Sequence, residues 1–327
     1  MRWRAAARRG FDGWNKLSGL RPLFRRGGKQ MSVSRGGRAL PVLAVLSATA
    51  ICASSGLFIK GLPFSSIAMT SLRMTTPFLL ALPSAWRHGV LFGKPGMRKA
   101  LFVASALNGF RMLLFVIAFK LTSMGNAVVL LYLWPIFALL VESLKEKKPL
   151  GLSKVGVLLI SLFGVVVMNL HNGFALSRSD FLGSLVMIVS AFVYAVTAVM
   201  FKKALKEVKE VDTVFFQNAA GGIVFLPFLV AELPGAAIAH VGLGALYGLV
   251  VGFIGFGLIF YGMKRLTLFQ YGALSYTEVP FAVLAGILFL GEGLTINQMA
   301  GILLVVGGSF LAQRLRSLPA TGAPERG

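Results

Sequence analysis

Residues 121–140 read LTSMGNAVVLLYLWPIFALL, and residues 266–285, which lie 145 positions further along the chain, read LTLFQYGALSYTEVPFAVLA. Both stretches open with a Leu-Thr pair, and both carry a proline at the same place, Pro135 and Pro280. A glycine follows at the same offset in each copy, at Gly156 and Gly301. A hydrophobic chain whose second half repeats its first is typical of membrane proteins that are assembled from internal repeats.

The composition places the chain in a membrane. Hydrophobic residues make up 56% of the 327 residues and charged residues 13%, and the mean hydropathy is +0.79, so a soluble globule would lack the polar surface to cover itself. A membrane-spanning helix needs about 20 mostly apolar residues. We predict an all-α polytopic membrane protein with ten transmembrane helices, at 41–59, 65–84, 100–119, 122–143, 152–170, 182–201, 213–231, 241–262, 268–290 and 295–313.

The formal net charge of +22 is distributed unevenly about the predicted spans. With the N-terminus in the cytoplasm, 28 of the 33 lysines and arginines fall in inner segments, and only Lys60, Lys120 and Arg178 fall outside. The positive-inside rule predicts this asymmetry for an even number of helices with both termini in the cytoplasm. We therefore expect a multi-pass protein of the inner (cytoplasmic) membrane of a cell, whose basic surface meets the lipid bilayer rather than nucleic acid.

The predicted spans divide into two repeats of five helices. Because five is odd, the second repeat enters the membrane from the opposite side, and we expect the repeats to be inverted. The first repeat is predicted at 39–170, a linker at 171–181 and the second repeat at 182–315. Residues 1–38 are predicted to be a basic, Arg-rich and Gly-rich cytoplasmic tail, with an organellar transit peptide or a start at Met31 as alternatives, and 316–327 a second cytoplasmic tail.

Two motifs carry a family resemblance. The segment LSYTEVPFAVLAGILFLGE at 274–292, followed by Gln298-Met-Ala-Gly301, resembles the second-half motif of EamA-type transporters of the drug/metabolite transporter superfamily, and Tyr132-Leu-Trp-Pro135 resembles the first-half motif. The resemblance covers about residues 39–315, although Lys147 stands where the second half has Glu292. It implies a ten-helix permease with a central cavity for a small-molecule substrate.

Enzyme motifs are missing from the sequence. It contains no H-E-x-x-H, no Walker-type Gly-Lys-Ser/Thr, and no aspartate within a predicted span. The glycines Gly244, Gly248 and Gly252 recur every four residues, which predicts close helix packing rather than a dinucleotide loop. The three histidines fall near span ends or in loops. We expect no enzymatic activity, no metal site and no cofactor.

Three charged residues lie within predicted spans, namely Arg73, Arg111 and Glu278. A charge at mid-bilayer costs roughly 2.5–3.5 kcal/mol on insertion scales, so it normally faces the protein interior or water. Asn108 precedes Arg111 by three residues and shares its helical face, which predicts that both bind an anionic part of the substrate. Glu278 is the candidate for proton coupling. The alternatives are an Arg111–Glu278 pair and, favoured for Arg73, a structural or gating role.

Polar aromatic and amide side chains inside the spans are further candidates for substrate binding, because they can stack on a ligand and hydrogen-bond to it. These are Tyr132, Trp134, Tyr194, Gln217, Tyr261 and Tyr276. Ordinary membrane packing is the alternative for each of them. Pro135 and Pro280 are predicted to break helices, freeing carbonyls or allowing bending during gating.

The sequence predicts a secondary active transporter that moves a small metabolite, such as an amino acid or a related anionic or zwitterionic compound, by alternating access. A passive channel or a non-transporting membrane scaffold of the same fold is the alternative. Coupling to protons and assembly into a homodimer are both compatible with this prediction.

Overall fold

The computed structural model describes residues 39–92, 95–122, 124–146, 151–169, 178–290 and 295–315, and this part of the chain is helical throughout, without a strand. The first half contains α2 (Ala39–Cys52), α3 (Ser55–Gly61), α4 (Ser66–Arg87), η3 (Val90–Phe92), α5 (Pro95–Leu121), α6 (Met124–Leu131), α7 (Trp134–Glu146) and α8 (Leu152–Asn169). The second half contains α9 (Arg178–Ala204), α10 (Glu210–Val224), α11 (Leu226–Glu232), η5 (Leu233–Gly235), α12 (Ile238–Tyr247), η6 (Gly248–Gly255), α13 (Phe256–Arg265), α14 (Leu268–Ser275), α15 (Glu278–Leu290) and α16 (Ile296–Arg314). Both predicted tails, most of the predicted linker, Lys147 and Glu292 lie outside the described residues.

Length and composition alone give fewer spans than the ten predicted. Six helical segments of the described chain are long and apolar enough to cross a membrane, and a seventh is formed if α10 and α11, which are bent by 56°, count as one span. The apolar helix at Leu152–Met168 is too short for this criterion. In the second half, the predicted range 268–290 is divided between the two short helices α14 and α15. The ten-helix count is therefore not confirmed by this test.

Helices of the two halves pack against each other in pairs. Pairs that bring the halves together include α4 with α10, α5 with both α9 and α10, α8 with α16, α2 with α13, and α7 with both α9 and α14. Small residues allow the close approach: a Cβ added at Gly301 of α16 would lie 2.5 Å from the Gly164 carbonyl oxygen of α8. Without water to exclude between helices, such tight packing is a main source of association in membranes.

The glycines spaced by four residues serve the same purpose on α12 and η6. A Cβ at Gly244 would meet Leu72, and one at Gly248 would meet Thr76, both on α4. Gly252 faces Arg73 and Pro77 of the same helix. The predicted packing role of this glycine series is confirmed, and α4 is its partner.

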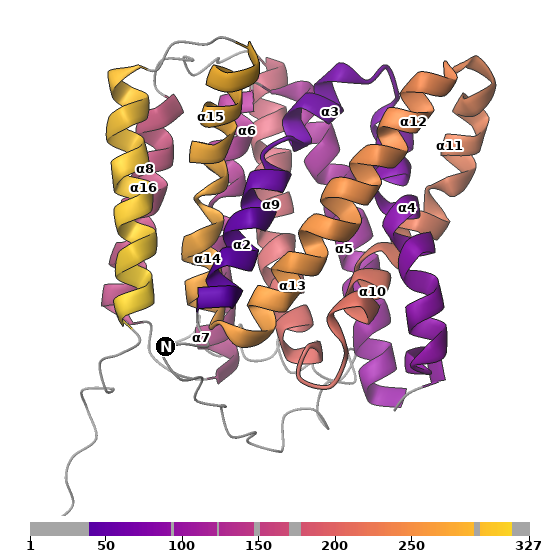
Figure 1. Cartoon of the computed structure of the whole chain (residues 1–327), viewed down its shortest axis with the longest axis horizontal. Coiled ribbons are helices and arrows are strands. Elements are labelled where there is room, and N and C mark those ends of the chain that lie inside the picture. The colour runs from indigo at the N-terminus through magenta and orange to yellow at the C-terminus, as the bar shows by residue number, and fades with distance from the viewer. Residues whose placement is uncertain are drawn as a thin grey trace, which may run out of the picture.

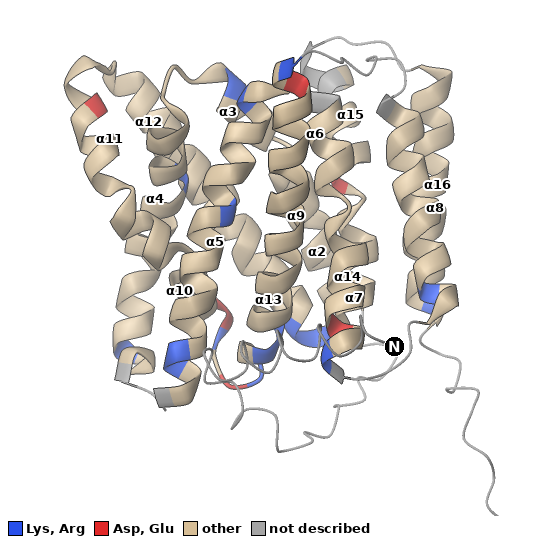
Figure 2. Cartoon of the chain, turned by 180° about the vertical axis from the view of Figure 1, so that it is seen from behind, with Lys and Arg blue, Asp and Glu red and all other residues tan. Residues whose placement is uncertain are grey.

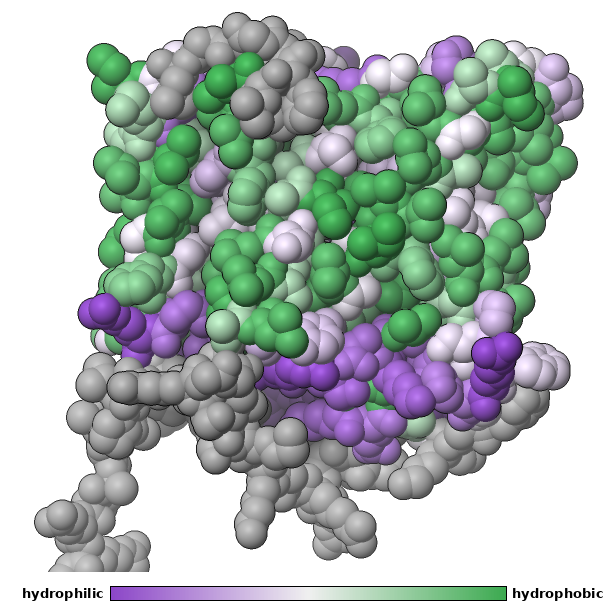
Figure 3. Space-filling model, viewed as in Figure 1, coloured by the Kyte–Doolittle hydropathy of each residue, from purple (hydrophilic) through white to green (hydrophobic). Residues whose placement is uncertain are grey.

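The surface of the bundle suits a bilayer. Apolar side chains form a broad belt around the middle of the face in view, with hydrophilic residues gathered toward one end (Figure 3). Lysines and arginines of the described chain concentrate at that end, where charged residues lie close together (Figure 2). The beginning of α2 and the end of α16 also lie at this end (Figure 1).

Two helix breaks precede the paired prolines. α6 ends at Leu131 and α7 begins at Trp134, so Pro135 falls in the first turn of α7, where its missing N–H costs nothing. α15 likewise begins two residues before Pro280. The breaks meet in space, because the Tyr276 hydroxyl donates to the Tyr132 carbonyl over 3.0 Å. This junction of the two halves forms one wall of the central cavity.

Candidate functional site

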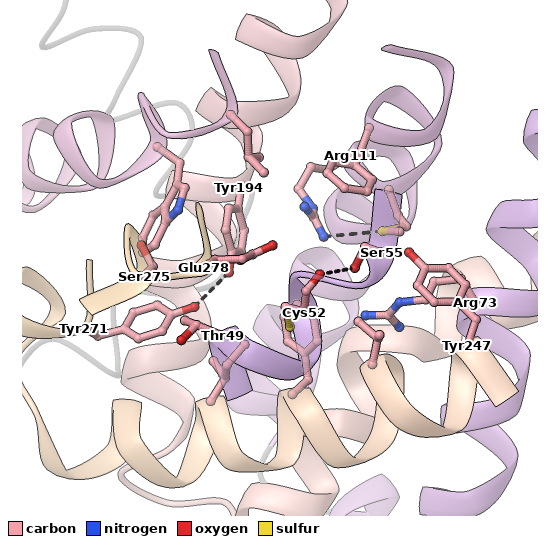
Figure 4. A pocket seen from close by; sticks show the side chains of 17 residues that line it. Thr49, Cys52, Ser55, Arg73, Arg111, Tyr194, Tyr247, Tyr271, Ser275 and Glu278 are labelled. Carbon is pink, nitrogen blue, oxygen red and sulfur yellow. Dashed lines mark hydrogen bonds between the residues drawn. The ribbon is translucent and has the colours of Figure 1, made fainter. Parts of the chain in front are cut away.

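A cavity lies where the broken helices meet α2, α4, α5 and α9, and it has about 570 Å³ of empty space, counting the part that opens to its surroundings. Figure 4 shows the lining side chains: two arginines lie on one side, and Glu278 with tyrosines from α9 and α14 lies on the other. The cavity therefore has chemically distinct ends.

The arginine side consists of Arg73 from α4 and Arg111 from α5. Their exposed fractions are only 3% and 5%. Arg111 lies over two rings, with its guanidinium carbon 4.5 Å from the centre of Tyr194 and 5.8 Å from that of Phe115. Its one hydrogen bond within the described chain reaches the sulfur of Met112 at 3.6 Å, and its Nε has no partner there. Neither arginine forms an ion pair with an acid of the described chain.

Aromatic side chains from α7, α9 and α14 form the wall that Arg111 contacts through Tyr194. Trp134, the first residue of α7, packs on Tyr194 of α9 and Tyr271 of α14, with ring centres 4.7 and 5.2 Å apart. The hydroxyls of Tyr194 and Tyr271 are 2.9 Å apart and share a hydrogen bond. The helix break before Pro135 turns Trp134 toward these tyrosines. Such a wall can stack on an apolar or planar part of a ligand and still offer hydroxyl groups.

Glu278 supplies the only carboxyl group among the lining residues. It is the first residue of α15, so its carboxyl lies at the positive end of that helix dipole. Ser275, at the end of α14, and Thr49 of α2 line the same part of the cavity (Figure 4). The sequence analysis also considered an ion pair between Arg111 and Glu278. No ion pair within 4 Å joins these two residues in the described chain.

The structure brings five of the sequence-selected residues together in the lining: Arg73, Arg111, Trp134, Tyr194 and Glu278. Asn108 lies outside it, since its amide donates to the Gln217 carbonyl over 2.7 Å, a contact that joins α5 to α10. The Gln217 side chain is also outside the lining. The predicted sharing of a ligand by Asn108 and Arg111 remains untested by this geometry.

Three selected tyrosines lie elsewhere. Tyr132 and Tyr276 pack on each other with ring centres 5.3 Å apart, directly behind the cavity at the junction of the helix breaks. The Tyr132 hydroxyl is buried and has no hydrogen-bond partner in the described residues. The ring of Tyr261 packs against Arg265, whose guanidinium carbon lies 3.6 Å from the ring centre. Arg265 also forms an ion pair with Glu210.

Several lining residues were not selected from the sequence. Two of them, Tyr247 and Tyr271, are tyrosines like those selected from the sequence. No feature of the sequence marks which tyrosines face inward. Cys52, Ser55 and Ser275 are small residues at helix ends. A signal exists for Ser275, which borders the break that Pro280 indicates, whereas Cys52 and Ser55 border a break at 53–54 that no proline marks.

Metal ligands do not cluster in the described ranges, where no group of three His, Cys, Asp or Glu side chains could hold an ion. His88 instead contacts Asp212 at 2.9 Å, at the basic end of the bundle. The cavity is lined by two arginines, one carboxyl, hydroxyls, the Cys52 thiol and aromatic rings.

Comparison with known proteins agrees with the motifs. A family model described as the EamA-like transporter family matches residues 39–170 and again 181–313. An "Uncharacterized transporter" of Archaeoglobus fulgidus is 25% identical over 272 residues, which cover 83% of this chain and 95% of the relative. "Uncharacterized transporter YcxC" of Bacillus subtilis is 24% identical over 189 residues, covering 53% of this chain and 59% of the relative. A solved structure titled "Crystal structure of protein" superposes with a TM-score of 0.69 at 20% identity, over 86% of this chain and 100% of the other, and so shares the fold.

Proposed function

The chain belongs to the EamA-like transporter family, and on this premise we propose that it is a secondary active transporter that moves a small anionic or zwitterionic metabolite by alternating access. The family and the names of its relatives point to a transporter rather than an enzyme. The observation that carries the substrate class is the pair of buried guanidinium groups that line the cavity without an acidic partner in the described chain.

The substrate class follows from the cost of these charges. A buried ion is strongly unfavourable unless other charges or hydrogen bonds compensate it. Cation–π contacts contribute only about 0.5–2 kcal/mol each, which does not replace a counter-ion. An anionic group of the substrate would supply the missing partner for Arg111, and the wall of Trp134, Tyr194 and Tyr271 would contact the rest of the molecule.

Alternating access needs two halves that can exchange roles, and the helix pairing supports inverted repeats. When each helix is replaced by its counterpart in the other repeat, the α2–α13 contact becomes the α9–α5 contact, and the pairs α4–α10 and α8–α16 map onto themselves. Ten spans accommodate this symmetry if each broken pair counts as one span. The basic end of the bundle would face the cytoplasm of a cell with an inner (cytoplasmic) membrane, by the positive-inside rule.

Glu278 is the proposed coupling group. A carboxyl can carry either a proton or a negative charge, and this one lines the cavity at a helix break beside the Tyr276–Tyr132 junction. A proton bound here would change the charge of the cavity that meets the substrate. Transport would then depend on the proton gradient.

The test begins with an untargeted comparison of metabolites in cells with and without the gene. A compound whose level changes is then assayed with the purified chain in liposomes, where a transporter gives saturable counterflow driven by unlabelled substrate on the far side. Flux without counterflow would indicate a passive channel. If none of the compounds found by the metabolite comparison gives any flux, the result would favour a non-transporting membrane scaffold. A homodimer is compatible with each outcome.

A further inference from the structure

We infer that Arg73 and Arg111 together bind one oxoanion group of the substrate, a carboxylate or a phosphate, so that Arg73 is a substrate-binding residue rather than a structural one. The claim that the bound oxoanion belongs to a transported substrate rests on the proposed function. Whether the two arginines bind an oxoanion at all can be tested by binding measurements alone.

Arg73 has the surroundings of a ligand-binding arginine. Its guanidinium carbon lies 5.4 Å from the ring centre of Tyr247 and 5.1 Å from that of Phe256. Its Nε has no hydrogen-bond partner in the described chain. A structural arginine at this depth would instead be neutralised by an acid or would donate to free carbonyls. No ion pair within 4 Å joins Arg73 to an acid of the described chain, and its Nε donates to no carbonyl there.

The two arginines converge on one place. Both line the cavity, from adjacent helices α4 and α5, and Figure 4 shows their guanidinium groups on the same side of it, near Ser55 and Cys52. Tyr247, whose ring lies beside the Arg73 guanidinium, also lines this side of the cavity. Two like charges repel, and an anion bound between them would make the arrangement favourable. A planar fork on each side suits the oxygens of a carboxylate or a phosphate.

Gly252 in η6 provides the space for the Arg73 guanidinium. A Cβ at this position would lie 2.5 Å from Nη1 of Arg73 and 2.9 Å from Cγ of Pro77. η6 has the wider turns of a π-helix, a geometry that is frequent at functional sites. Gly252 is therefore a positioning residue, because an alanine there would displace the guanidinium without changing any charge.

The first measurement is ligand-induced stabilisation of the purified full-length chain in detergent. The probes are benzoate for a carboxylate, phenylphosphonate for a phosphate, and benzamide as the uncharged match of benzoate. We expect benzoate, phenylphosphonate or both to raise the unfolding midpoint and benzamide to leave it unchanged, and whichever anion acts names the oxoanion. Arg73→Gln and Arg111→Gln should each weaken anion binding by roughly tenfold or more, as for the loss of a charge-assisted hydrogen bond.

Matched glycine variants separate positioning from general packing. Gly252→Ala should weaken anion binding, because it moves the Arg73 guanidinium. Gly248→Ala, one turn earlier in η6, would meet Thr76 and the Leu72 carbonyl of the same helix α4, and it should bind the anion like the wild type. Full anion binding by Arg73→Gln, with loss in Arg111→Gln, would overturn the inference.

A second measurement uses Cys52, the one cysteine of the chain, which lines the same cavity. Its rate of modification by a negatively charged methanethiosulfonate should exceed that by a positively charged one, and the ratio should fall several-fold in Arg73→Gln, or in Gly252→Ala if Arg73→Gln does not fold. An unchanged ratio, or no reaction together with no anion-induced stabilisation of the wild type, contradicts the two-arginine site. Normal counterflow by Arg73→Gln would reject it while leaving the proposed transport intact.

Discussion

At the scale of single residues, Glu278 has the most direct consequence for energy coupling. Glu278→Gln keeps the size and most hydrogen bonding of the side chain but cannot bind or release a proton. We expect it to abolish uptake driven by a pH gradient while counterflow persists, because counterflow requires only that the loaded cavity change sides. The exposed acid Glu207 at the basic end provides the control, and Glu207→Gln should transport like the wild type. Unchanged pH-driven uptake in Glu278→Gln would exclude it as the coupling residue.

Arg111 tests the predicted anion contact. Arg111→Lys keeps the positive charge but loses the planar fork that can hold two oxygens at once. We expect the apparent affinity for the substrate, measured by the concentration dependence of counterflow, to fall by about tenfold or more, with the protein still present in the membrane. Arg87→Lys, at an exposed position at the end of α4, should have no effect. Normal transport by Arg111→Ala would make Arg111 merely structural.

Glu278 and Arg111 could be selected from the sequence because a charged side chain within an apolar span is energetically unfavourable and is therefore usually functional. The same argument cannot choose among tyrosines, whose rings are stable both in the core and at the membrane interface. Tyr271 lies in the cavity and Tyr276 behind it, although only five positions separate them. Five positions along an α-helix turn a side chain by about 140°, so Tyr271 in α14 and Tyr276 directly after it point to different sides.

At the scale of helices, the contact between α14 and α7 depends on Gly272. A Cβ at this position would lie 2.9 Å from Cβ of Pro135, a ring that cannot move aside. We expect Gly272→Ala to lower the stability of the purified protein by about 1–3 kcal/mol, as for overpacking elsewhere, measured by its unfolding midpoint in detergent. Gly257→Ala in α13, where a Cβ meets nothing within 4 Å, is the matched control. Equal unfolding midpoints for Gly272→Ala and Gly257→Ala would show that the α14–α7 contact can accommodate the added methyl group.

The helix breaks differ in how far sequence predicts them. Pro135 and Pro280 indicated two of them, and the 56° bend between α10 and α11 coincides with Pro227 in the first turn of α11. The break between α2 and α3 has no proline. There the Ser55 hydroxyl donates to the Cys52 carbonyl over 2.7 Å, and Thr49 meets Thr277 of the other half at 3.0 Å. Such a break depends on side-chain hydrogen bonds that the hydrophobic pattern does not reveal.

At the scale of the whole molecule, hydrophobicity predicted where helices lie but not which helices touch. The α5–α9 and α2–α13 contacts join segments that are far apart in the chain. Their partners are chosen by complementary small and large residues along each helix. Gly183 of α9, for example, approaches Thr122 at the end of α5, where an added Cβ would lie 2.9 Å from the Thr122 Cβ. Shape complementarity of this kind exists only in three dimensions. The sequence repeat therefore predicted that the two halves are related, but only the structure shows which helices pair.

The topology provides the last prediction. If the basic end of the bundle is cytoplasmic, Ser65 and Gly235, at the opposite end of α4 and after α11, face the outside, as should Asn172 between the repeats. In a background without Cys52, the variants Ser65→Cys, Asn172→Cys and Gly235→Cys should react in intact cells with a thiol reagent that does not cross the membrane. Lys147→Cys and Lys206→Cys should react only after the cells are permeabilised. The physical reason is that moving 28 of the 33 basic residues to the outer side would oppose the charge bias that orients membrane proteins. Labelling of Lys147→Cys in intact cells would contradict this orientation, and with it the assignment of both ends of the bundle.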